Sequence, residues 1–391
     1  MEPTARHTYL DWLRLLCIAG VLVFHCAMPF ATDEQWHIRN AESSNLLLEL
    51  VAFMHLWRMP LLFFVSGAVS YYMLRRRSAG SFVGLRVRRL LVPLVFGMLV
   101  VVPPQIYMER LTQGFQGSFW HFYPSIFTTG SYPHGNLSWH HLWFVAYLLD
   151  YDLLLAPLFA WLAGPRSAGF RARLGRLAGG YRVYLLAVPG IVWYAATSRA
   201  LPQTNDLIHD GSFFVYWLLF VLMGFVCAAQ PALLARLEQL RRSSLTVGFV
   251  ALLALNYLRW NNVELPDGFP PVFPPTIAWS LVLAFIGYGK HYLQRPHPAL
   301  NYLNQAAYPF YILHQTVIVV LAYYVVQTPD SVPSKYLFLV VVTLLVSMGL
   351  FHLLIRPVPV LRFLFGMKPQ EPRPAAAEPA APQPIAQLQP A

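Results

Sequence analysis

The sequence predicts an all-α integral membrane protein, a helical bundle of about ten transmembrane helices with both termini in the cytoplasm. The first observation is composition: 57% of the 391 residues are hydrophobic and only 12% are charged, about half the charged fraction of a soluble domain. The second is that the apolar residues form long runs without the period-two alternation of barrel strands, and in lipid a helix satisfies its own backbone polar groups. The third is the alternation of charge from loop to loop.

Ten apolar runs come near the ~20 residues that a helix needs to cross the hydrocarbon core. Aromatic residues make up 15% of the chain, as is typical of proteins with interfacial belts of Trp and Tyr. The runs at 183–197 and 273–289 are short for a span. We predict spans at about 10–31, 47–74, 90–106, 140–162, 183–197, 212–229, 244–261, 273–289, 303–326 and 336–356.

Basic residues gather in alternate loops. Of the 28 Lys and Arg residues, 21 lie at 75–89, 166–182, 236–242 and 290–295 or near the two termini, and the loops between these are acidic. Basic loops stay in the cytoplasm, so we expect both termini inside and the acidic loops outside. Topology therefore accounts for the net charge of +11, and nucleic-acid binding is not needed to explain it.

Two regions differ in composition. Residues 1–366 are predicted to form the membrane-embedded domain. Residues 367–391 are rich in Pro, Ala and Gln, cannot bury enough apolar surface to fold, and are predicted to be a disordered cytoplasmic tail. The three cysteines all lie in apolar runs, and neither an HExxH nor a CxxC motif occurs. We therefore expect neither a disulfide framework nor a metal site.

The first predicted span carries Asp11, Arg14 and His25. Ionisable side chains in a membrane helix are costly and suggest function. Arg14 and His25 are eleven residues apart, so they lie on one helix face about 16 Å apart along the axis. Imidazole titrates near neutral pH, which suits a general base. The alternatives are that Arg14 reaches the headgroups and pairs with Asp11, and that His25 is a buried histidine satisfied by a neighbour.

The second predicted span carries His55 and Arg58 three residues apart. His55 is expected about 12 Å into its helix, at a depth similar to that of His25, so a short outer loop can bring the two together. Arg58 cannot easily reach water and needs an acidic side chain, carbonyl groups or a ligand anion as its partner. Ser66 and Gly67 form a small patch that suits close helix packing.

An arginine-rich segment, RRRSAGSFVGLRVRR, follows the second span. Positive-inside topology explains much of it. Arginine also binds phosphate through bidentate hydrogen bonds, and Arg86 and Arg89 are placed at the entrance of the third span, where they suit a nucleotide phosphate. Both interpretations stay open at this point. The remaining candidates are His140 and His141 with Trp143 at the start of the fourth span, and His314 in the ninth.

Taken in order, these motifs resemble the membrane-bound acyltransferase type 3 family. The family's first helix carries Arg or Lys, ten residues, then His, which Arg14 and His25 match. FFVSGA resembles its FF-x-SG element, RVRR its Arg-x-x-Arg element, and HLWFV and YPFYILHQ its later elements. The matches run from about residue 9 to 325. WHIRNAES, HLWRM, RVRRLLVPL, PPQIYM and LRFLFGMKP further resemble the glucan biosynthesis protein C branch, which succinylates osmoregulated periplasmic glucans.

The resemblance implies an O-acyltransferase of the bacterial inner membrane. It would move an acyl group, succinyl or acetyl, from a cytoplasmic acyl-CoA to a hydroxyl of a periplasmic or cell-surface glycan. His25 would be the base, with His55 as a further catalytic candidate, and Arg14 and Arg58 would position or polarise the donor. Acyl-CoA is a donor substrate, so no permanently bound cofactor and no metal are expected. The remaining predicted roles are phosphate binding by Arg86 and Arg89, and substrate binding by His141, Trp143, His314 and Trp36.

Two alternatives belong to other functional classes. A flippase or exporter of a glycan or lipid would also have about ten helices and buried charge, but transporters often show repeated halves and matching broken helices, and the sequence shows neither. A membrane-embedded glycan polymerase or ligase would need a lipid-pyrophosphate donor and large outer loops. The longest predicted outer loop, about 107–139, is modest. Consumption of a thioester by the purified protein separates the acyltransferase from the transporter.

Overall fold

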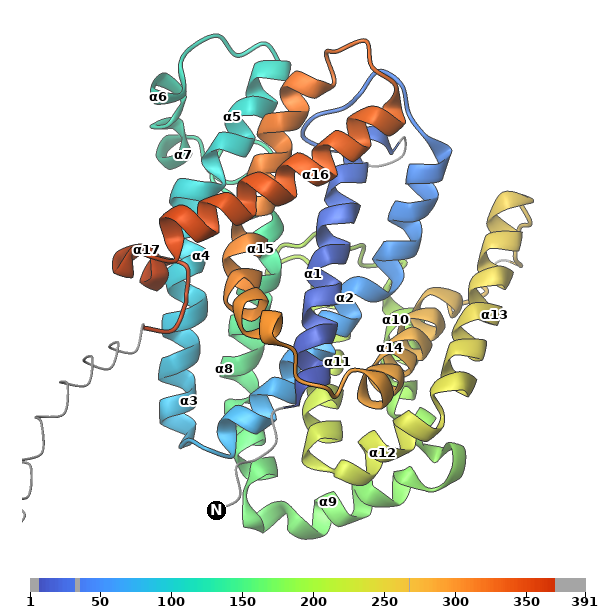
Figure 1. Ribbon diagram of the computed structural model, residues 1–391. Coiled ribbons are helices and arrows are strands. Elements are labelled where there is room, and N and C mark those ends of the chain that lie inside the picture. The colour runs from blue at the N-terminus through green and yellow to red at the C-terminus, as the bar shows by residue number, and fades with distance from the viewer. Residues whose placement is uncertain (1–6, 32–35, 267, 370–391) are drawn as a thin grey trace, which may run out of the picture.

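The computed structural model describes residues 7–31, 36–266 and 268–369. Over these ranges the chain is helical, and its one β contact is an isolated bridge between Ser131 and Leu137. The predicted tail from 370 onward lies outside the described residues. Figure 1 shows the long helices gathered into one bundle, with α16 crossing its face obliquely and α13 standing at its edge.

The long helices of the bundle are α1 (Thr8–Ala27), α2 (Asn45–Leu74), α8 (Trp143–Ala163), α11 (Gly211–Ala229), α13 (Arg241–Trp260), α14 (Phe273–Tyr292), α15 (Pro298–Val325) and α16 (Val332–Leu350). The shorter helices are α3 (Ala79–Arg86), α4 (Val92–Phe96), α5 (Pro103–Thr112), α6 (Phe119–Phe122), α7 (Ser125–Thr128), α9 (Ala168–Gly175), α10 (Val188–Thr197), α12 (Pro231–Gln239) and α17 (Pro359–Leu364). Short 3-10 or π-helical turns complete several of them, among them η1 (Met28–Phe30), η2 (Val87–Leu91), η3 (Gly97–Val101), η4 (His140–Leu142), η7 (Gly180–Leu186) and η8 (Phe351–Ile355).

Seven helical segments in the described chain are long and apolar enough to cross a membrane: Thr8–Phe30, Asn45–Leu74, Ala79–Thr112, His140–Ala163, Gly211–Ala229, Pro298–Val325 and Val332–Ile355. The other three predicted spans coincide with α10, α13 and α14, which are helices but do not belong to this set. α10 has only ten residues, and α13 carries three arginines in twenty. The protein is thus a polytopic helical membrane protein, with seven of the ten predicted spans found among these segments.

The arginine-rich segment is helical, although the sequence suggested a loop up to residue 89. The helix begins after Ser78, whose Oγ accepts a hydrogen bond from the Ser81 backbone N at 3.3 Å. From Ala79 it continues through α3, η2, α4, η3 and α5 to Thr112. A side-chain oxygen at the N-cap satisfies one of the free amide groups of the first turn. As a result, Arg86 and Arg89 belong to a helix that packs on the bundle.

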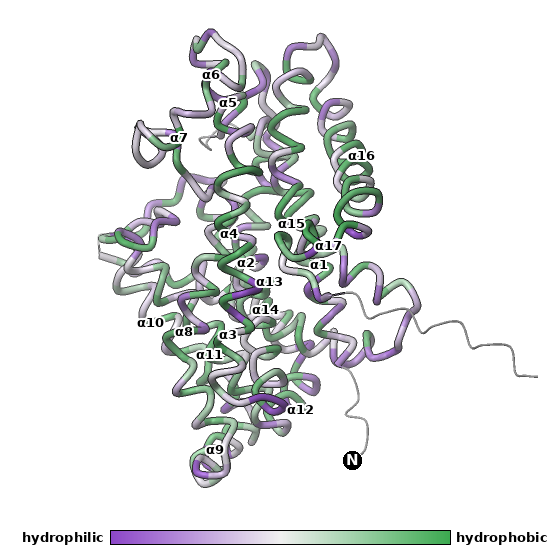
Figure 2. Tube along the Cα trace, turned by 90° about the vertical axis from the view of Figure 1, so that its left-hand side faces the viewer, coloured by the Kyte–Doolittle hydropathy of each residue, from purple (hydrophilic) through white to green (hydrophobic). Residues whose placement is uncertain are grey.

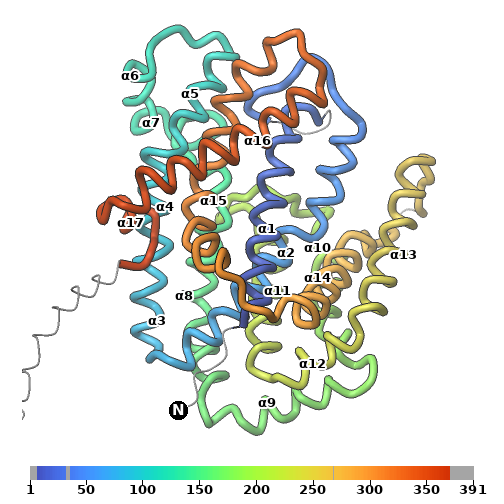
Figure 3. Tube along the Cα trace, viewed as in Figure 1, coloured from blue at the N-terminus to red at the C-terminus, as the bar shows by residue number. Residues whose placement is uncertain are grey.

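The two ends of the bundle differ in the segments that they carry. The described N-terminus lies at the same end as α9, α12 and the connection between α2 and α3, and the helices α5, α6 and α7 lie at the opposite end (Figures 1 and 3). Figure 2 shows hydrophobic residues along the long helices and hydrophilic residues concentrated in the loops and short helices at the ends. Three of the basic loops predicted to be cytoplasmic are therefore collected on one side of the molecule.

The centre of the bundle is a tightly packed pair of helices, α2 and α11. A Cβ added at Gly67 would lie 1.9 Å from the Val221 carbonyl oxygen, and one added at Gly224 would lie 1.9 Å from the Phe64 carbonyl oxygen. The two backbones therefore touch at two reciprocal positions, as small residues permit in membranes. The predicted packing role of Gly67 is confirmed by this contact.

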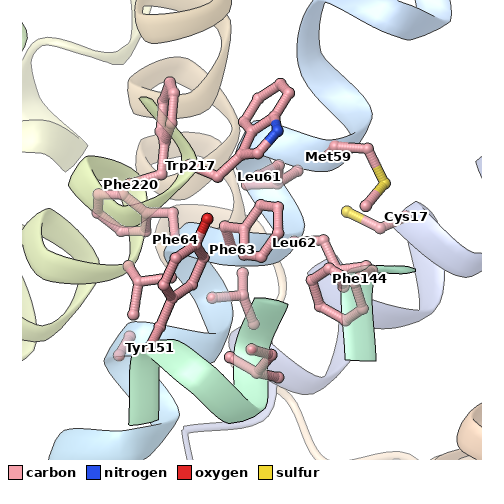
Figure 4. Close-up of a cluster of buried hydrophobic side chains, with 14 of the residues drawn as sticks. Cys17, Met59, Leu61, Leu62, Phe63, Phe64, Phe144, Tyr151, Trp217 and Phe220 are labelled. Atoms are coloured by element: carbon pink, nitrogen blue, oxygen red, sulfur yellow. The ribbon is translucent and has the colours of Figure 1, made fainter. Parts of the chain in front are cut away.

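Aromatic side chains fill the space beside this crossing. Figure 4 shows Phe63 of α2 surrounded by Phe144, Tyr151 and Trp217 from α8 and α11. The ring centres of Phe63 and Phe144 are 4.7 Å apart, and those of Phe63 and Trp217 are 5.8 Å apart. This core packs against α2, and α2 carries Arg58 one to two turns before the cluster.

Candidate active site

Two histidines from distant parts of the chain form a hydrogen-bonded pair. His25 lies in the last turn of α1, and His314 lies in α15, where its side chain is fully buried. The Nδ1 atom of His25 is 2.8 Å from the Nε2 atom of His314. On its other side, His314 Nδ1 is 2.6 Å from the backbone carbonyl oxygen of Tyr311.

These contacts fix which nitrogen carries each proton. A carbonyl oxygen only accepts hydrogen bonds, so Nδ1 of His314 is the protonated nitrogen. In a neutral His314 the Nε2 atom is then an acceptor, and His25 donates to it from Nδ1–H. The Nε2 atom of a neutral His25 is consequently left with its lone pair. No hydrogen bond to this atom is formed by the described part of the chain, so it is available to accept a proton.

A third histidine packs against this pair. The rings of His141, in η4, and His314 meet edge to face, with their centres 5.2 Å apart. His141 donates from Nε2 to the Ile312 carbonyl oxygen at 2.9 Å, and its own carbonyl oxygen accepts a hydrogen bond from the Tyr311 hydroxyl. Its Nδ1 atom is buried and has no partner within the described ranges. The structure thus brings together three of the predicted site residues, one each from α1, η4 and α15.

The indole ring of Trp36 stacks on the imidazole ring of His25. The two rings are stacked, with their centres 5.5 Å apart and an interplanar angle of 19°. The indole Nε1 of Trp36 is buried, and no described residue accepts its hydrogen bond. Trp36 was predicted to bind substrate, and its position beside His25 is compatible with that role.

Arg58 and His55 of α2 both contact Phe24, the residue that precedes His25 in α1. The Arg58 guanidinium carbon lies 3.6 Å from the centre of the Phe24 ring, and His55 meets the same ring edge to face at 4.7 Å. Arg58 is only 4% exposed, whereas His55 lies on the exposed side of α2. The predicted approach of α2 to the end of α1 that carries His25 is thus found, because Arg58 and His55 both pack on Phe24.

Arg14 lies far from this group, nearer the N-terminal end of α1. Its NH2 atom is 2.6 Å from Asn304 Oδ1 and 3.4 Å from Asp11 Oδ1. Eleven residues of α1 separate it from His25, about 16 Å along the helix axis. The structure therefore contains the Asp11 pairing that was left open as the alternative. The predicted catalytic role of Arg14 has no support from proximity to His25.

Arg86 is held in a buried ion pair. Its Nε atom is 2.6 Å from Asp152 Oδ2, and its NH2 atom donates to Ser70 Oγ at 2.7 Å. Asp152 is fully buried. The charge of Arg86 is thus already compensated within the protein. Arg89 and its neighbour Arg88 instead line a small pocket of about 50 Å³ against the segment that follows α17. Phosphate binding by Arg89 agrees with this position and stays a prediction.

Trp143 lies among aromatic side chains and not in the histidine group. Its ring centre is 5.2 Å from that of Tyr147, 6.0 Å from that of Phe63 and 6.3 Å from that of Trp217. These contacts give it a packing role in the core that supports α8. Substrate binding by Trp143 therefore draws no support from its surroundings.

A cavity of about 400 Å³ opens beside Trp36 and includes residues that the sequence did not single out. His37 donates from Nδ1 to Glu109 Oε2, and the Tyr132 hydroxyl donates to both oxygens of the same carboxylate at 3.2 and 3.3 Å. Arg110 adds its charge 3.5 Å from Glu109. Burial and the negative charge of Glu109 raise the pKa of Tyr132 to about 12, so its hydroxyl stays a donor.

Hydrogen bonds connect the cavity to Gln315, the residue that follows His314 in the chain. His37 Nε2 lies 3.4 Å from Gln315 Nε2, and Gln315 follows His314 in α15. Gln315 also donates to Gln105 Oε1 at 3.1 Å. His37, Gln105 and Glu109 all lie in or next to the motifs WHIRNAES and PPQIYM. The signal was therefore present in the sequence, but nothing in it showed that these segments meet.

Comparison with known proteins identifies the family. Residues 7–352 match the type 3 family model described as "Acyltransferase domain". The chain belongs to the membrane-bound acyltransferase type 3 family. The matched region includes all the helices that contribute to the histidine group, so the candidate site of this membrane acyltransferase lies within the family domain.

Curated relatives match over almost the whole acyltransferase chain. "Glucans biosynthesis protein C" of Salmonella heidelberg is 23% identical over 392 residues, which cover 94% of this chain and 96% of the relative. The protein of the same name from Salmonella typhi is also 23% identical, and that from Salmonella paratyphi B is 24% identical, over the same shares. No solved structure matches this chain.

Proposed function

We propose that this acyltransferase transfers an acyl group from a cytoplasmic acyl-CoA to a hydroxyl of a glycan on the outer side of a bacterial inner membrane. The observation that supports it most is the His25–His314 pair, because the Tyr311 carbonyl sets the tautomers so that His25 Nε2 is the free base. The name of the relatives favours a glucan as the acceptor.

The reaction needs only a positioned base, because a thioester is already activated. The acceptor hydroxyl oxygen attacks the thioester carbon while His25 Nε2 takes the hydroxyl proton. The C–S bond breaks as the new C–O bond is completed, and the departing thiolate of CoA takes the proton from His25. His314 holds the imidazole in orientation throughout, and it can share the positive charge while His25 is protonated.

The acceptor and the donor approach from different ends of the bundle. The cavity beside Trp36 is lined by two aromatic rings and by Glu109, Arg110 and His37, a mixture of flat apolar faces and hydrogen-bonding groups that suits a sugar ring. At the other end, Arg88 and Arg89 offer guanidinium groups that suit the phosphates of CoA.

The experiment is thioester consumption by the purified protein in lipid nanodiscs. Acyl-CoA and a gluco-oligosaccharide are supplied together, and free CoA and acylated sugar are both measured. We expect the two products in equal amounts. A protein that moves the sugar across vesicle membranes and leaves the thioester intact is a transporter, and that result would contradict the proposal.

A further inference from the structure

Three buried polar atoms close to His37 have no hydrogen-bond partner among the residues that the structure describes. They are the Nε1 atom of Trp36, the Nε2 atom of His140 and the Oε1 atom of Gln315. A buried polar atom without a partner costs free energy. A site that keeps several such atoms together is completed by a ligand or by bound water.

His37 is the common neighbour of the three side chains. Its ring centre is 4.9 Å from that of Trp36 and 4.5 Å from that of His140. Its Nε2 atom is 3.4 Å from Gln315 Nε2. Trp36 and His37 both line the cavity of about 400 Å³, and the ring of Trp36 also stacks on that of His25. Trp36 thus joins the cavity to the proposed base.

The orientation of the Gln315 amide follows from a chain of hydrogen bonds. The Thr316 hydroxyl donates to the Val101 carbonyl oxygen at 2.7 Å, so its oxygen is the acceptor for Gln105 Nε2, also at 2.7 Å. Gln105 is then left with Oε1, which accepts from Gln315 Nε2 at 3.1 Å. Gln315 is only 3% exposed, and its Oε1 is therefore an acceptor that the described chain leaves unused.

The other two unpartnered atoms are hydrogen-bond donors. An indole Nε1 carries a proton and only donates. His140 Nδ1 is 3.1 Å from Ser138 Oγ, which accepts from the His140 backbone N–H at 3.0 Å. The hydroxyl proton of Ser138 is thus directed to Nδ1, and a neutral His140 carries its own proton on Nε2. His140 also has a φ of 41°, in the left-handed region, and such strained backbone is concentrated at binding and active sites.

Two charged side chains that line the cavity are used by the protein itself. Glu109 accepts hydrogen bonds from His37 and Tyr132. Arg110 donates to two side-chain oxygens and two backbone oxygens. The three unpartnered atoms are instead two neutral donors and one neutral acceptor. Because a hydroxyl group both donates and accepts, a molecule with several hydroxyl groups can satisfy all three.

We propose that Trp36, His140 and Gln315 bind hydroxyl groups of the acceptor that do not react, so that the enzyme selects its acceptor by contacts beyond the reacting hydroxyl. Trp36 Nε1–H and His140 Nε2–H donate to the oxygens of these hydroxyls, and Gln315 Oε1 accepts from one of them. Held in this way, the acceptor presents its reacting hydroxyl to His25, on whose ring Trp36 stacks. This inference rests on the proposed acyltransferase function and assigns specificity-determining residues to its acceptor site.

The test compares a short gluco-oligosaccharide with its monodeoxy derivatives as acceptors. Full-length protein in nanodiscs is supplied with saturating acyl-CoA, kcat and KM are measured for each acceptor, and the acylated position is identified in the parent product. We expect at least one derivative that lacks a non-reacting hydroxyl to lose roughly tenfold or more in kcat/KM. A site built to bind a hydroxyl group rejects the analogue that leaves its polar atoms unpaired.

The variant Trp36→Phe keeps a ring that can stack on His25 and removes the Nε1–H donor. We expect it to raise KM for the parent acceptor roughly tenfold, the effect of one hydrogen bond, with KM for the acyl-CoA unchanged. The penalty for the derivative that lacks the hydroxyl bound by Trp36 should disappear in this variant, because the two changes remove the same contact. The matched control is Trp120→Phe on α6. Trp120 is 78% exposed and is not part of the cavity lining, so this variant should keep the wild-type pattern.

Three results are distinguishable. A wild-type enzyme that acylates every derivative retaining the reacting hydroxyl as efficiently as the parent would overturn the inference, whether or not the variant folds. A folded Trp36→Phe protein that keeps every wild-type penalty would also overturn it, because bound water would then account for the unpartnered atoms. No acylation of the parent oligosaccharide by the wild-type protein would instead contradict the proposed function.

Discussion

The Nδ1 atom of His25 lies 2.8 Å from the Nε2 atom of His314, although the two residues are 289 positions apart in the chain. The carbonyl oxygen of Tyr311 holds the second nitrogen of His314 at 2.6 Å. Two hydrogen bonds thus orient the imidazole of His25 and decide its tautomer. In the proposed reaction, His25 is the catalytic residue and His314 is a positioning residue.

Replacement of His314 tests this arrangement. In His314→Ala, His25 loses the acceptor for its Nδ1–H, and we expect kcat to fall on the order of 10²-fold or more, as when a base loses the group that orients it. His314→Gln keeps an acceptor oxygen and should retain at least tenfold more activity than the alanine variant, roughly in line with one charge-assisted hydrogen bond. KM for the acyl-CoA should change little in both. Identical losses in both variants would mean that His314 only fills space.

Much of the fold could be predicted from the sequence, because few backbone conformations are possible within the hydrocarbon region of a membrane. Seven of the ten predicted spans are helices of spanning length, since a long apolar run can satisfy its backbone only as a helix. The run at 244–261 is harder to interpret, because Arg241 and Arg242 precede it on α13 and Arg259 lies near its end. The helix at 79–86 was missed because its signal, the Ser78 cap, lies in a segment dominated by arginine.

The crossing of α2 and α11 gives a prediction about stability. Gly67→Ala places a methyl group 1.9 Å from the Val221 carbonyl oxygen, so the helices must separate. We expect a loss of about 1–3 kcal/mol or more in the free energy of unfolding, as in other overpacked cores, measured as a lower melting temperature in detergent. Gly84→Ala in α3 is the control, because open space surrounds that Cβ. The control should be neutral or stabilise the protein by roughly 0.5–1 kcal/mol. Equal behaviour of the two variants would show that the crossing is looser than described.

Neutralising Arg86 and Arg89 should have different effects. Arg89→Gln should weaken acyl-CoA binding without lowering the melting temperature, because Arg89 lines a small pocket and is not part of a buried ion pair in the described chain. Arg86→Gln leaves Asp152 as an unpaired buried charge and should cost about 3–5 kcal/mol of stability. The double variant Arg86→Met, Asp152→Leu should recover most of that loss. Weaker donor binding by the stable double variant would show that Arg86 also contacts the donor, as the sequence suggested.

The orientation in the membrane can be read from cysteine labelling. The three native cysteines are buried, so an introduced one reports its own position. Basic residues mark 166–182 as cytoplasmic and acidic residues mark 206–210 as external. A membrane-impermeant maleimide added to intact cells should therefore label Gln203→Cys and not Gly169→Cys. Efficient labelling at position 169 would invert the topology and the sides from which donor and acceptor enter.

The sequence pointed to some members of the candidate site, but not to their contacts. His25 and Arg58 stood out because charged and titratable groups are rare in membrane spans. The partnership of His25 with His314, and that of Arg86 with Asp152, depends on the register between helices distant in sequence, which packing sets and no spacing reveals. The grouping of His37 with Glu109 was missed for the same reason, since 72 positions separate them.

The most direct test of the account is turnover by His25→Ala, with donor binding measured on the same preparation. His25 Nε2 is the atom proposed to take the acceptor proton, and its loss should lower acyl transfer on the order of 10²–10⁴-fold. The variant should still insert into the membrane and bind acyl-CoA with the affinity of the wild-type protein, because the proposed phosphate-binding arginine, Arg89, is not changed. Near-normal transfer by a folded His25→Ala protein would contradict the account and pass the role of the base to His141, His55 or His314.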